Sequence, residues 1–374
     1  MSPEDASWQR LHQALEKDDL ALFVGAGVSY VAPRPKGPGG GLPNWGEFAD
    51  RLGKAADLAR SEIAFLKKRG RTLPTIMSLI QDRLCSKLCA DACEERHQVW
   101  TAAMRDVLYR DFKRALRQHQ IDPESDRFRL VLVAEEEESK ADYPELCKYM
   151  EKRFASLTAI VKLCSARASS EDKKRDPERE WVPQRGIRAV LTYNIDALIQ
   201  IYDRARHGRR VFRTVERSSK KSRGRKMPLY QLHGYMQPLE VGPAHEATDR
   251  LVLTESEYHK RTDEQFNFAM TSTLWALRET VCVFVGCSMT DELMRRGLYR
   301  SRSERIRDSL SEGKKPARAE EEALRHFAVL KIEDQSKFER DLELLGVRPL
   351  WVKDFAPDLP RRILDLKTKL AAGM

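Results

Sequence analysis

The chain has 374 residues, of which 41% are hydrophobic and 33% are charged, a balance typical of a folded globular protein rather than a disordered one. It carries 67 Lys and Arg against 57 Asp and Glu, and the net charge of +10 is compatible with an acidic partner or nucleic acid. No run of about 18 uncharged apolar residues occurs and the N-terminus lacks a signal-peptide core, so we expect a cytoplasmic protein with no membrane partner.

The seven cysteines predict reduced thiols rather than a disulfide framework. Cys85, Cys89 and Cys93 recur at every fourth residue, a spacing that would place them on one face of a helix. Because structural zinc modules use close C-x-x-C pairs or Cys/His mixtures, we favour core packing for these thiols. We therefore predict no zinc and no other metal site.

The first half of the chain is predicted to contain one strand and many helices. A helix is expected over residues 7–17, and the apolar run at 20–24 predicts a strand buried on both faces of a parallel sheet. Residues 46–166 show mostly helical periodicity. The charged segment 171–180 is expected to be a solvated loop.

Beyond residue 180, short apolar runs alternate with helical or turn segments, as in a doubly wound parallel sheet. The predicted strands cover residues 187–191, 229–232, 251–253, 281–285, 327–332 and 347–352. We expect a single α/β domain with a Rossmann-like parallel sheet. Its core would be residues 1–45 and 184–354, with a large helical insertion at 46–183 and a C-terminal helix at 355–374.

The turn after the first strand has the residues of a phosphate-binding loop. Gly25, Ala26, Gly27 and Ser29 follow the strand, where bare backbone lets N–H groups approach a pyrophosphate. Tyr30 replaces the third glycine of the G-x-G-x-x-G fingerprint, so the ordinary dehydrogenase motif fails. On this motif alone, a tight turn without a ligand is about equally supported.

Later strands deliver further polar residues to the same edge, because the carboxyl ends of parallel strands meet there. In chain order these residues are Thr192, Asn194 and Asp196, then His233, then Gly286, Ser288 and Asp291. A lone histidine is usually structural, and either aspartate could be a helix cap. Four such turns in order favour a ligand site over a purely structural role.

The motifs GAGVS at 25–29, TYNID at 192–196, LHG at 232–234 and GCS at 286–288 resemble those of the sirtuin superfamily. The resemblance covers residues 20–46 and 186–352 and points to the bacterial sirtuin-like branch of antiphage defence systems. It implies a sirtuin-type sheet, NAD as the substrate, and Asn194 and His233 as catalytic residues. The residues it implies for NAD binding are Gly25, Ala26, Gly27, Ser29, Trp45, Thr192, Asp196, Gly286, Ser288 and Asp291. Of these, Gly286, Ser288 and Asp291 would face the adenosine half of NAD.

Two departures distinguish the chain from protein-deacylating sirtuins. Those enzymes carry two C-x-x-C zinc pairs shortly after the catalytic histidine, whereas no cysteine follows His233 before Cys282. Their G-I-P-D-F-R segment is GLPNWG here, which keeps an aromatic, Trp45, able to cover the nicotinamide but loses the Asp and the Arg. The resemblance thus favours NAD itself over an acylated peptide as the substrate.

We expect a phage-defence effector that depletes NAD by hydrolysing it to ADP-ribose and nicotinamide. Asn194 would position the ribose or a water, and His233 would act as the base, both on exposed turns. Asp196 would anchor the ribose or polarise Asn194. The alternatives are a protein deacylase or ADP-ribosyltransferase, and a non-catalytic module that binds NAD or ADP-ribose.

Partners are suggested by charge and by the resemblance. Residues 204–226 contain eleven Lys or Arg and a single aromatic, Phe212, so a solvated loop is favoured over nucleic-acid binding. The acidic quartet 135–138 is a candidate counter-charge. The resemblance implies a homo-oligomer and a protein partner such as a HerA-type ATPase or an Argonaute-like protein.

Overall fold

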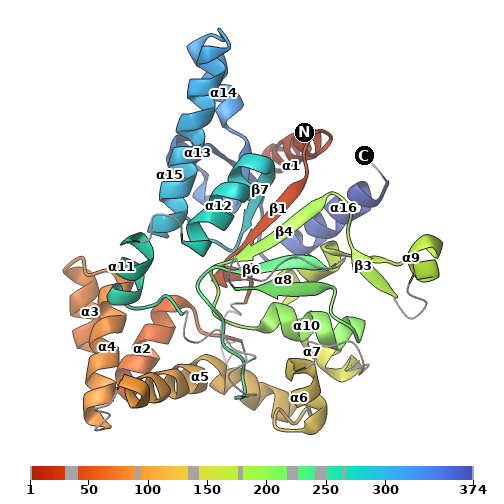
Figure 1. Cartoon of the computed structure of the whole chain (residues 1–374). Coiled ribbons are helices and arrows are strands. Elements are labelled where there is room, and N and C mark those ends of the chain that lie inside the picture. The colour runs from red at the N-terminus through yellow and green to blue at the C-terminus, as the bar shows by residue number, and fades with distance from the viewer. Residues whose placement is uncertain are drawn as a thin grey trace.

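The computed structural model describes residues 2–29, 41–88, 93–133, 143–175, 180–216, 226–240, 251–263 and 267–372. These residues form a seven-stranded parallel sheet with the order β5-β6-β4-β1-β7-β8-β9 (Figure 1). Its strands are β1 (Leu20–Val24), β4 (Ile187–Thr192), β5 (Phe212–Val215), β6 (Met227–Gln231), β7 (Val281–Val285), β8 (His326–Lys331) and β9 (Val347–Val352). The predicted α/β fold with a Rossmann-like parallel sheet is confirmed.

Helices surround this sheet. Before β4 they are α1 (Pro3–Leu15), α2 (Trp45–Ala55), α3 (Arg60–Lys68), α4 (Leu73–Lys87), α5 (Cys93–Gln118), α6 (Asp126–Val133), α7 (Pro144–Arg153), α8 (Ala155–Leu163) and α9 (Ser170–Arg175). After β4 they are α10 (Leu198–His207), α11 (Glu255–Asp263), α12 (Phe268–Glu279), α13 (Glu292–Ser311), α14 (Pro316–Ala323), α15 (Gln335–Leu344) and α16 (Asp358–Ala372). Short 3-10 helices, η1 (Ala26–Val28) and η4 (Ile332–Asp334), follow β1 and β8, and β2 (Ser165–Arg167) pairs with β3 (Trp181–Pro183) in an antiparallel hairpin. None of the helices in the described ranges is long and apolar enough to cross a membrane.

The central strand β1 is buried along its whole length, as its apolar run predicts. Leu20, Leu22 and Val24 belong to a hydrophobic core shared with α1, α8, α10 and α16. Ala21 and Phe23 point to the opposite face, in a core shared with α12, α13 and α15. The first core continues without a break into α2, α4, α5, α6 and α7, so the segment predicted as an insertion packs as part of the sheet's own core.

The chain order of the strands identifies a switch point at β1. From β1 the chain continues to β4, β5 and β6 on one side of it, and later to β7, β8 and β9 on the other. Ligands of open parallel sheets bind outside the carboxyl ends of strands at such a point, where neighbouring loops diverge. The turns that follow β1, β4 and β7 therefore meet at the place where a ligand is expected.

Two predicted segments differ in the structure. Residues 251–253 are not a strand, because the N–H of Val252 donates to the carbonyl of His233 and the N–H of Leu253 donates to the Glu257 carboxylate. Part of the predicted solvated loop at 171–180 forms α9, and residues 176–179 lie outside the described residues.

The basic run at 204–226 is also more ordered than predicted. Arg204 is 2% exposed within α10, and a strand, β5, lies inside the run. The Asp203 carboxylate accepts the N–H groups of Val211 and Phe212, which turns the chain from α10 into that strand. Residues 217–225 and the acidic quartet 135–138 lie outside the described residues.

Candidate functional site

A cleft of about 840 Å³ lies at the carboxyl ends of β1, β4 and β7. Nine of the twelve predicted site residues line it, namely Gly25, Ala26, Gly27, Trp45, Asn194, His233, Gly286, Ser288 and Asp291. The other three, Ser29, Thr192 and Asp196, are buried behind its wall. The sheet thus brings together residues as far apart in the sequence as Gly25 and Asp291, as the shared strand edge predicts.

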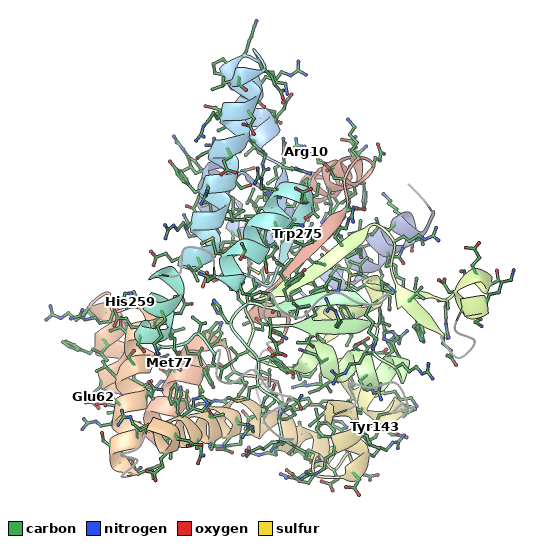
Figure 2. All side chains as sticks on the ribbon, viewed as in Figure 1. Arg10, Glu62, Met77, Tyr143, His259 and Trp275 are labelled. Atoms are coloured by element: carbon green, nitrogen blue, oxygen red, sulfur yellow. The ribbon has the colours of Figure 1, made fainter. Side chains whose placement is uncertain are left out.

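Residues outside the twelve predicted ones also line the cleft. Thr72, Leu73 and Pro74 come from the start of α4, Glu255, Tyr258 and His259 from α11, and Phe355 from the turn before α16. Figure 2 shows His259 on α11 beside α4, the helix that carries Met77. The sequence signal at Pro74 indicates only that a helix begins there, because nothing in local spacing tells which part of the sheet that helix approaches.

The two glycines of the first turn are required by the neighbouring turn. A Cβ on Gly25 would lie 2.4 Å from the carbonyl oxygen of Gly286, and one on Gly27 would lie 2.9 Å from it. The N–H of Gly25 donates to the carbonyl of Val285, and that of Gly27 donates to the carbonyl of Gly286. Because these two N–H groups already donate to carbonyl groups of the protein, a pyrophosphate bound here would need other hydrogen-bond donors.

Gly27→Val should therefore destabilise the protein before any effect on a ligand is considered. Its side chain would push against backbone atoms of Gly286, and overpacking of this kind costs roughly 1–3 kcal/mol. Urea unfolding measures the loss. Gly46→Ala is the matched control, because its Cβ would meet only the ends of two side chains, Asn44 at 3.3 Å and Lys67 at 3.9 Å, and no backbone. Equal stability of Gly27→Val and the wild type would contradict this packing argument.

Asn194 is held toward the first turn by its neighbours. The Thr192 hydroxyl donates to the carbonyl of Val24 at 2.7 Å and accepts the N–H of Asn194 at 3.0 Å. The Asn194 amide donates to the Ser29 hydroxyl at 3.4 Å. Asn194 is 4% exposed, so the expectation of an exposed turn is wrong for this residue. Thr192 and Ser29 are buried beside it and hold it by hydrogen bonds.

Asp196 lies below the cleft. Its carboxylate accepts the N–H of Leu198 at 3.0 Å, which satisfies one of the open donors at the start of α10. Burial raises the pKa of Asp196 to about 6, although hydrogen bonds from Leu198 and Ser29 oppose that rise. The alternative reading of Asp196, as a helix-capping residue, agrees with these contacts.

Asp196→Asn should stabilise the protein at neutral and alkaline pH. Burial raises the pKa of Asp196 to about 6 in the folded protein, whereas the usual pKa of a free aspartate carboxyl is 3.8. At about 1.4 kcal/mol per pKa unit, ionisation costs on the order of 3 kcal/mol above pH 6, and this cost disappears below about pH 4. Urea unfolding should show a gain at pH 8 that is absent at pH 4. Asp341→Asn is the control, because Arg295 lowers the pKa of Asp341 and its loss should reduce stability at pH 8.

His233 lies between two tyrosine rings and near a carboxylate. The rings of Tyr193 and Tyr258 meet it edge to face, with centroid distances of 4.8 and 5.7 Å. Its Nε2 atom is 3.9 Å from Oδ2 of Asp291. The side chain is 3% exposed, so the exposed turn expected for His233 is also wrong.

The two carboxylate oxygens of Asp291 have different partners. Its Oδ1 atom accepts the N–H of Met294 at 2.9 Å and caps α13, which agrees with the capping alternative. Its Oδ2 atom accepts a hydrogen bond from the Tyr258 hydroxyl at 3.0 Å and faces His233. Ser288, by contrast, is exposed, with its hydroxyl 2.7 Å from that of Thr290.

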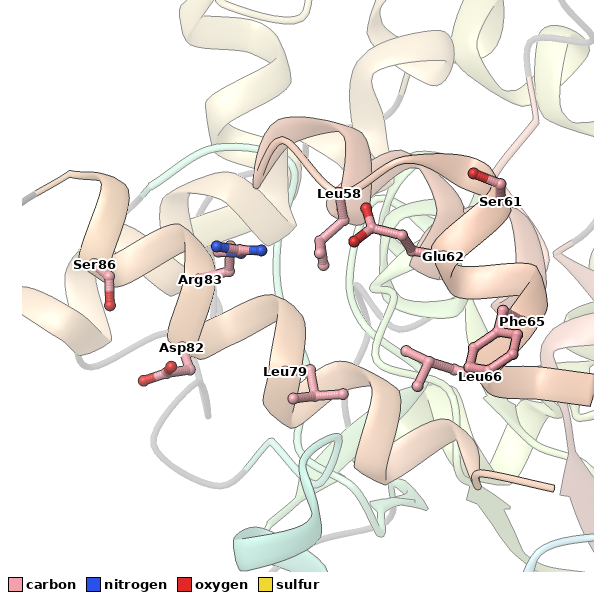
Figure 3. Close-up of a pocket in the computed structure, with 9 residues that line it drawn as sticks. All are labelled: Leu58, Ser61, Glu62, Phe65, Leu66, Leu79, Asp82, Arg83 and Ser86. Carbon is pink, nitrogen blue, oxygen red and sulfur yellow. The ribbon is translucent and has the colours of Figure 1, made fainter. Parts of the chain in front are cut away.

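A second cavity, about 660 Å³, lies between α3 and α4 (Figure 3). Its lining is mainly apolar, and its carboxylates have other partners. Glu62 accepts the N–H of Ala59, and Asp82 pairs with Arg96 at 3.1 Å. Because no reactive groups converge among these residues, the cleft at the sheet edge is the better candidate site.

The cysteines do not stack as predicted. Cys85 is buried in α4, which ends at Lys87, and Cys93 begins the next helix, while Cys89 lies outside the described residues. Within the described parts of the chain, no group of three or more His, Cys, Asp or Glu residues is placed to hold a metal ion.

A protein-family model described as a SIR2-like domain matches residues 188–350. That segment contains Asn194, His233 and Asp291, and it leaves out the first glycine turn and the helices between β1 and β4. No curated protein matches the chain.

Proposed function

We propose that this chain, whose residues 188–350 match a SIR2-like domain, has an NAD-related function and is an NAD glycohydrolase. It would cleave the bond between nicotinamide and the ribose of NAD, giving ADP-ribose and nicotinamide. The observation that carries the proposal is that Asn194 and His233, from the ends of two strands, line one cleft. An amide and an imidazole are the groups needed to position a nucleophile and to accept its proton.

The reaction follows from these two side chains. Water attacks C1′ of the ribose as the carbon–nitrogen bond breaks, and nicotinamide leaves with the bonding electron pair, which neutralises its ring. Asn194 orients the ribose hydroxyls or the water, and His233 accepts the proton that the water loses. A correctly placed base contributes about 10²–10⁴-fold in typical enzymes.

The cleft has features that suit a dinucleotide. Its volume lies within the usual range for ligand sites, roughly 300–1,000 Å³. The first residues of α2, α4, α11 and α13 all line it. Helix N-termini carry partial positive charge, which favours a pyrophosphate near these ends. Trp45, at the start of α2, supplies an aromatic ring for the nicotinamide.

The experiment that tests the proposal is incubation of the purified protein with NAD, with and without an acetylated peptide. We expect nicotinamide and ADP-ribose in equal amounts without the peptide. Release that requires the peptide would support a deacylase, and ADP-ribose attached to protein would support a transferase. If neither nicotinamide nor ADP-ribose forms, the chain is a module that only binds NAD or ADP-ribose.

In the cell, the proposed role is that of a cytoplasmic defence effector that depletes NAD during phage infection. An enzyme that destroyed NAD freely would harm its host, so restraint by assembly is expected. The proposed assembly is a homo-oligomer with a partner such as a HerA-type ATPase or an Argonaute-like protein. Phe65 and Leu79, which are 56% and 47% exposed in the cavity between α3 and α4, support a protein partner over direct nucleic-acid contact.

A further inference from the structure

Three side chains from separate elements meet at one end of the cleft. His233 follows β6, Tyr258 lies on α11, and Asp291 caps α13. The Oδ2 atom of Asp291 is 3.0 Å from the Tyr258 hydroxyl and 3.9 Å from Nε2 of His233. One carboxylate oxygen thus faces both the hydroxyl and the imidazole.

The Asp291 carboxylate is fixed before any substrate arrives. Its Oδ1 atom accepts the N–H of Met294 in the first turn of α13, so rotation of the carboxylate would break a helix cap. The Tyr258 hydroxyl donates to the other oxygen and limits the movement of that side as well. Both contacts hold Oδ2 in place beside the imidazole ring.

Ionisable side chains from several elements lie around His233. Among the described residues these include Tyr193 from the end of β4, Tyr258 from α11 and Asp291 from α13, and Cys287 from the turn after β7 lines the same cleft. Burial raises the pKa of Cys287 to about 12 and raises the pKa of both tyrosines above their usual range. Of these four side chains, Asp291 is the one carboxylate.

We propose that Asp291 and Tyr258 are positioning residues for His233, the carboxylate stabilising the protonated imidazole and the hydroxyl holding the carboxylate in place. The inference rests on the proposed glycohydrolase function, in which His233 gains a proton as water attacks. An opposite charge within about 4–6 Å favours the charged form of an ionisable group. The separation of 3.9 Å can shorten when the ring becomes charged, because catalytic hydrogen bonds are often long in ligand-free structures.

The anchoring of α11 supports a fixed place for Tyr258. The Glu257 carboxylate accepts the N–H groups of Leu253 and Thr254, each at 2.8 Å, and so closes the first turn of the helix. The N–H of Glu255 donates to the Ser78 hydroxyl of α4 at 2.9 Å. Tyr258 therefore approaches Asp291 from a helix that is tied at its start.

Tyr258→Phe and Asp291→Asn separate the two roles. The first removes the hydroxyl and keeps the ring against His233, and the second removes the charge and keeps an oxygen for the α13 cap. We expect kcat for NAD cleavage to fall by about 10-fold in Tyr258→Phe and about 100-fold in Asp291→Asn, with KM changed less than about 2-fold. Tyr202→Phe is the matched control, because the Tyr202 hydroxyl also donates to a carboxylate, that of Glu151, away from the cleft.

A second measurement uses the protein without NAD. In an NMR titration of the His233 ring, identified by its loss in His233→Ala, the midpoint should move to lower pH by about one unit in Asp291→Asn. In the His233→Ala background, Asp291→Asn should cause little further loss of activity, because it acts through the imidazole.

The outcomes separate this inference from the proposed function. If the wild type does not cleave NAD, the glycohydrolase proposal fails, while an unchanged His233 titration in Asp291→Asn overturns the positioning role by itself. If the wild type is active, normal kcat in both variants overturns the inference. A raised KM with normal kcat also overturns it, because Asp291 would then be a contact for NAD.

Discussion

Asn194→Ala and His233→Ala should each lower NAD cleavage by about 100-fold or more. Without the amide, the ribose or the water loses its orientation, and without the imidazole, the group proposed to accept the proton is lost. The double variant should be little worse than either single one, because residues that act as a unit are not additive. Nicotinamide release at saturating NAD is the measurement.

Because both side chains are buried, a loss of activity in the alanine variants could also come from a loss of stability. Asn194 is 4% exposed and donates to Ser29, and the His233 ring packs against Tyr193 and Tyr258, so alanine would also leave a cavity. Asn194→Asp and His233→Gln keep more of the volume and belong beside the alanine variants. Urea unfolding shows whether each variant is folded at the assay temperature. Wild-type turnover in any folded variant would contradict the catalytic assignment of that residue.

The parts of this site that could be predicted are those encoded by neighbours in the sequence. A buried apolar run followed by small or polar residues marks the carboxyl end of a parallel strand, and the strands at 20–24, 187–191 and 281–285 were predictable in this way. Because such ends share one edge, the meeting of Gly25, Asn194 and His233 followed without any knowledge of side-chain contacts.

What could not be predicted depends on contacts between distant segments. The need for glycine at position 25 comes from the carbonyl of Gly286, and the setting of Asp291 comes from Tyr258 on another helix. Arg204 belongs to a basic run by composition, yet it is buried because α10 packs against α6, α7 and α8. Residues 251–253 have the composition of a strand, but their N–H groups bind His233 and a carboxylate instead of a sheet partner.

Activity is expected to depend on assembly. The helices between β1 and β4 could transmit the binding of a partner to the cleft. The start of α4 lines the cleft through Thr72 and Pro74, and its Ser78 hydroxyl accepts the N–H of Glu255 at the start of α11. In Figure 1 the orange helix α4 lies beside the teal helix α11. A partner that shifts α4 would therefore move one wall of the cleft together with the helix that carries Tyr258.

The expected size of the effect follows from the populations involved. A nearly complete switch requires the partner or a second copy to bind the active arrangement about 5.5 kcal/mol more tightly than the inactive one. Turnover per subunit should rise with protein concentration or added partner and fall with salt, because salt screens contacts made by the basic run at 204–226. Arg204 is buried, so the salt-sensitive contact has to come from other residues of its run.

Ser78→Ala tests whether the route runs through α4 and α11. It removes the hydroxyl that accepts the N–H of Glu255, so part of the response to assembly should be lost while NAD still binds. Thr368→Ala is the control, because its hydroxyl also bonds within a helix, to the carbonyl of Leu364, far along the chain in α16. An equal response in Ser78→Ala and the wild type would exclude this hydrogen bond as the link. Full and constant turnover in a dilute monomer would exclude any control of activity by assembly. The helices between β1 and β4 would then only cover one face of the sheet.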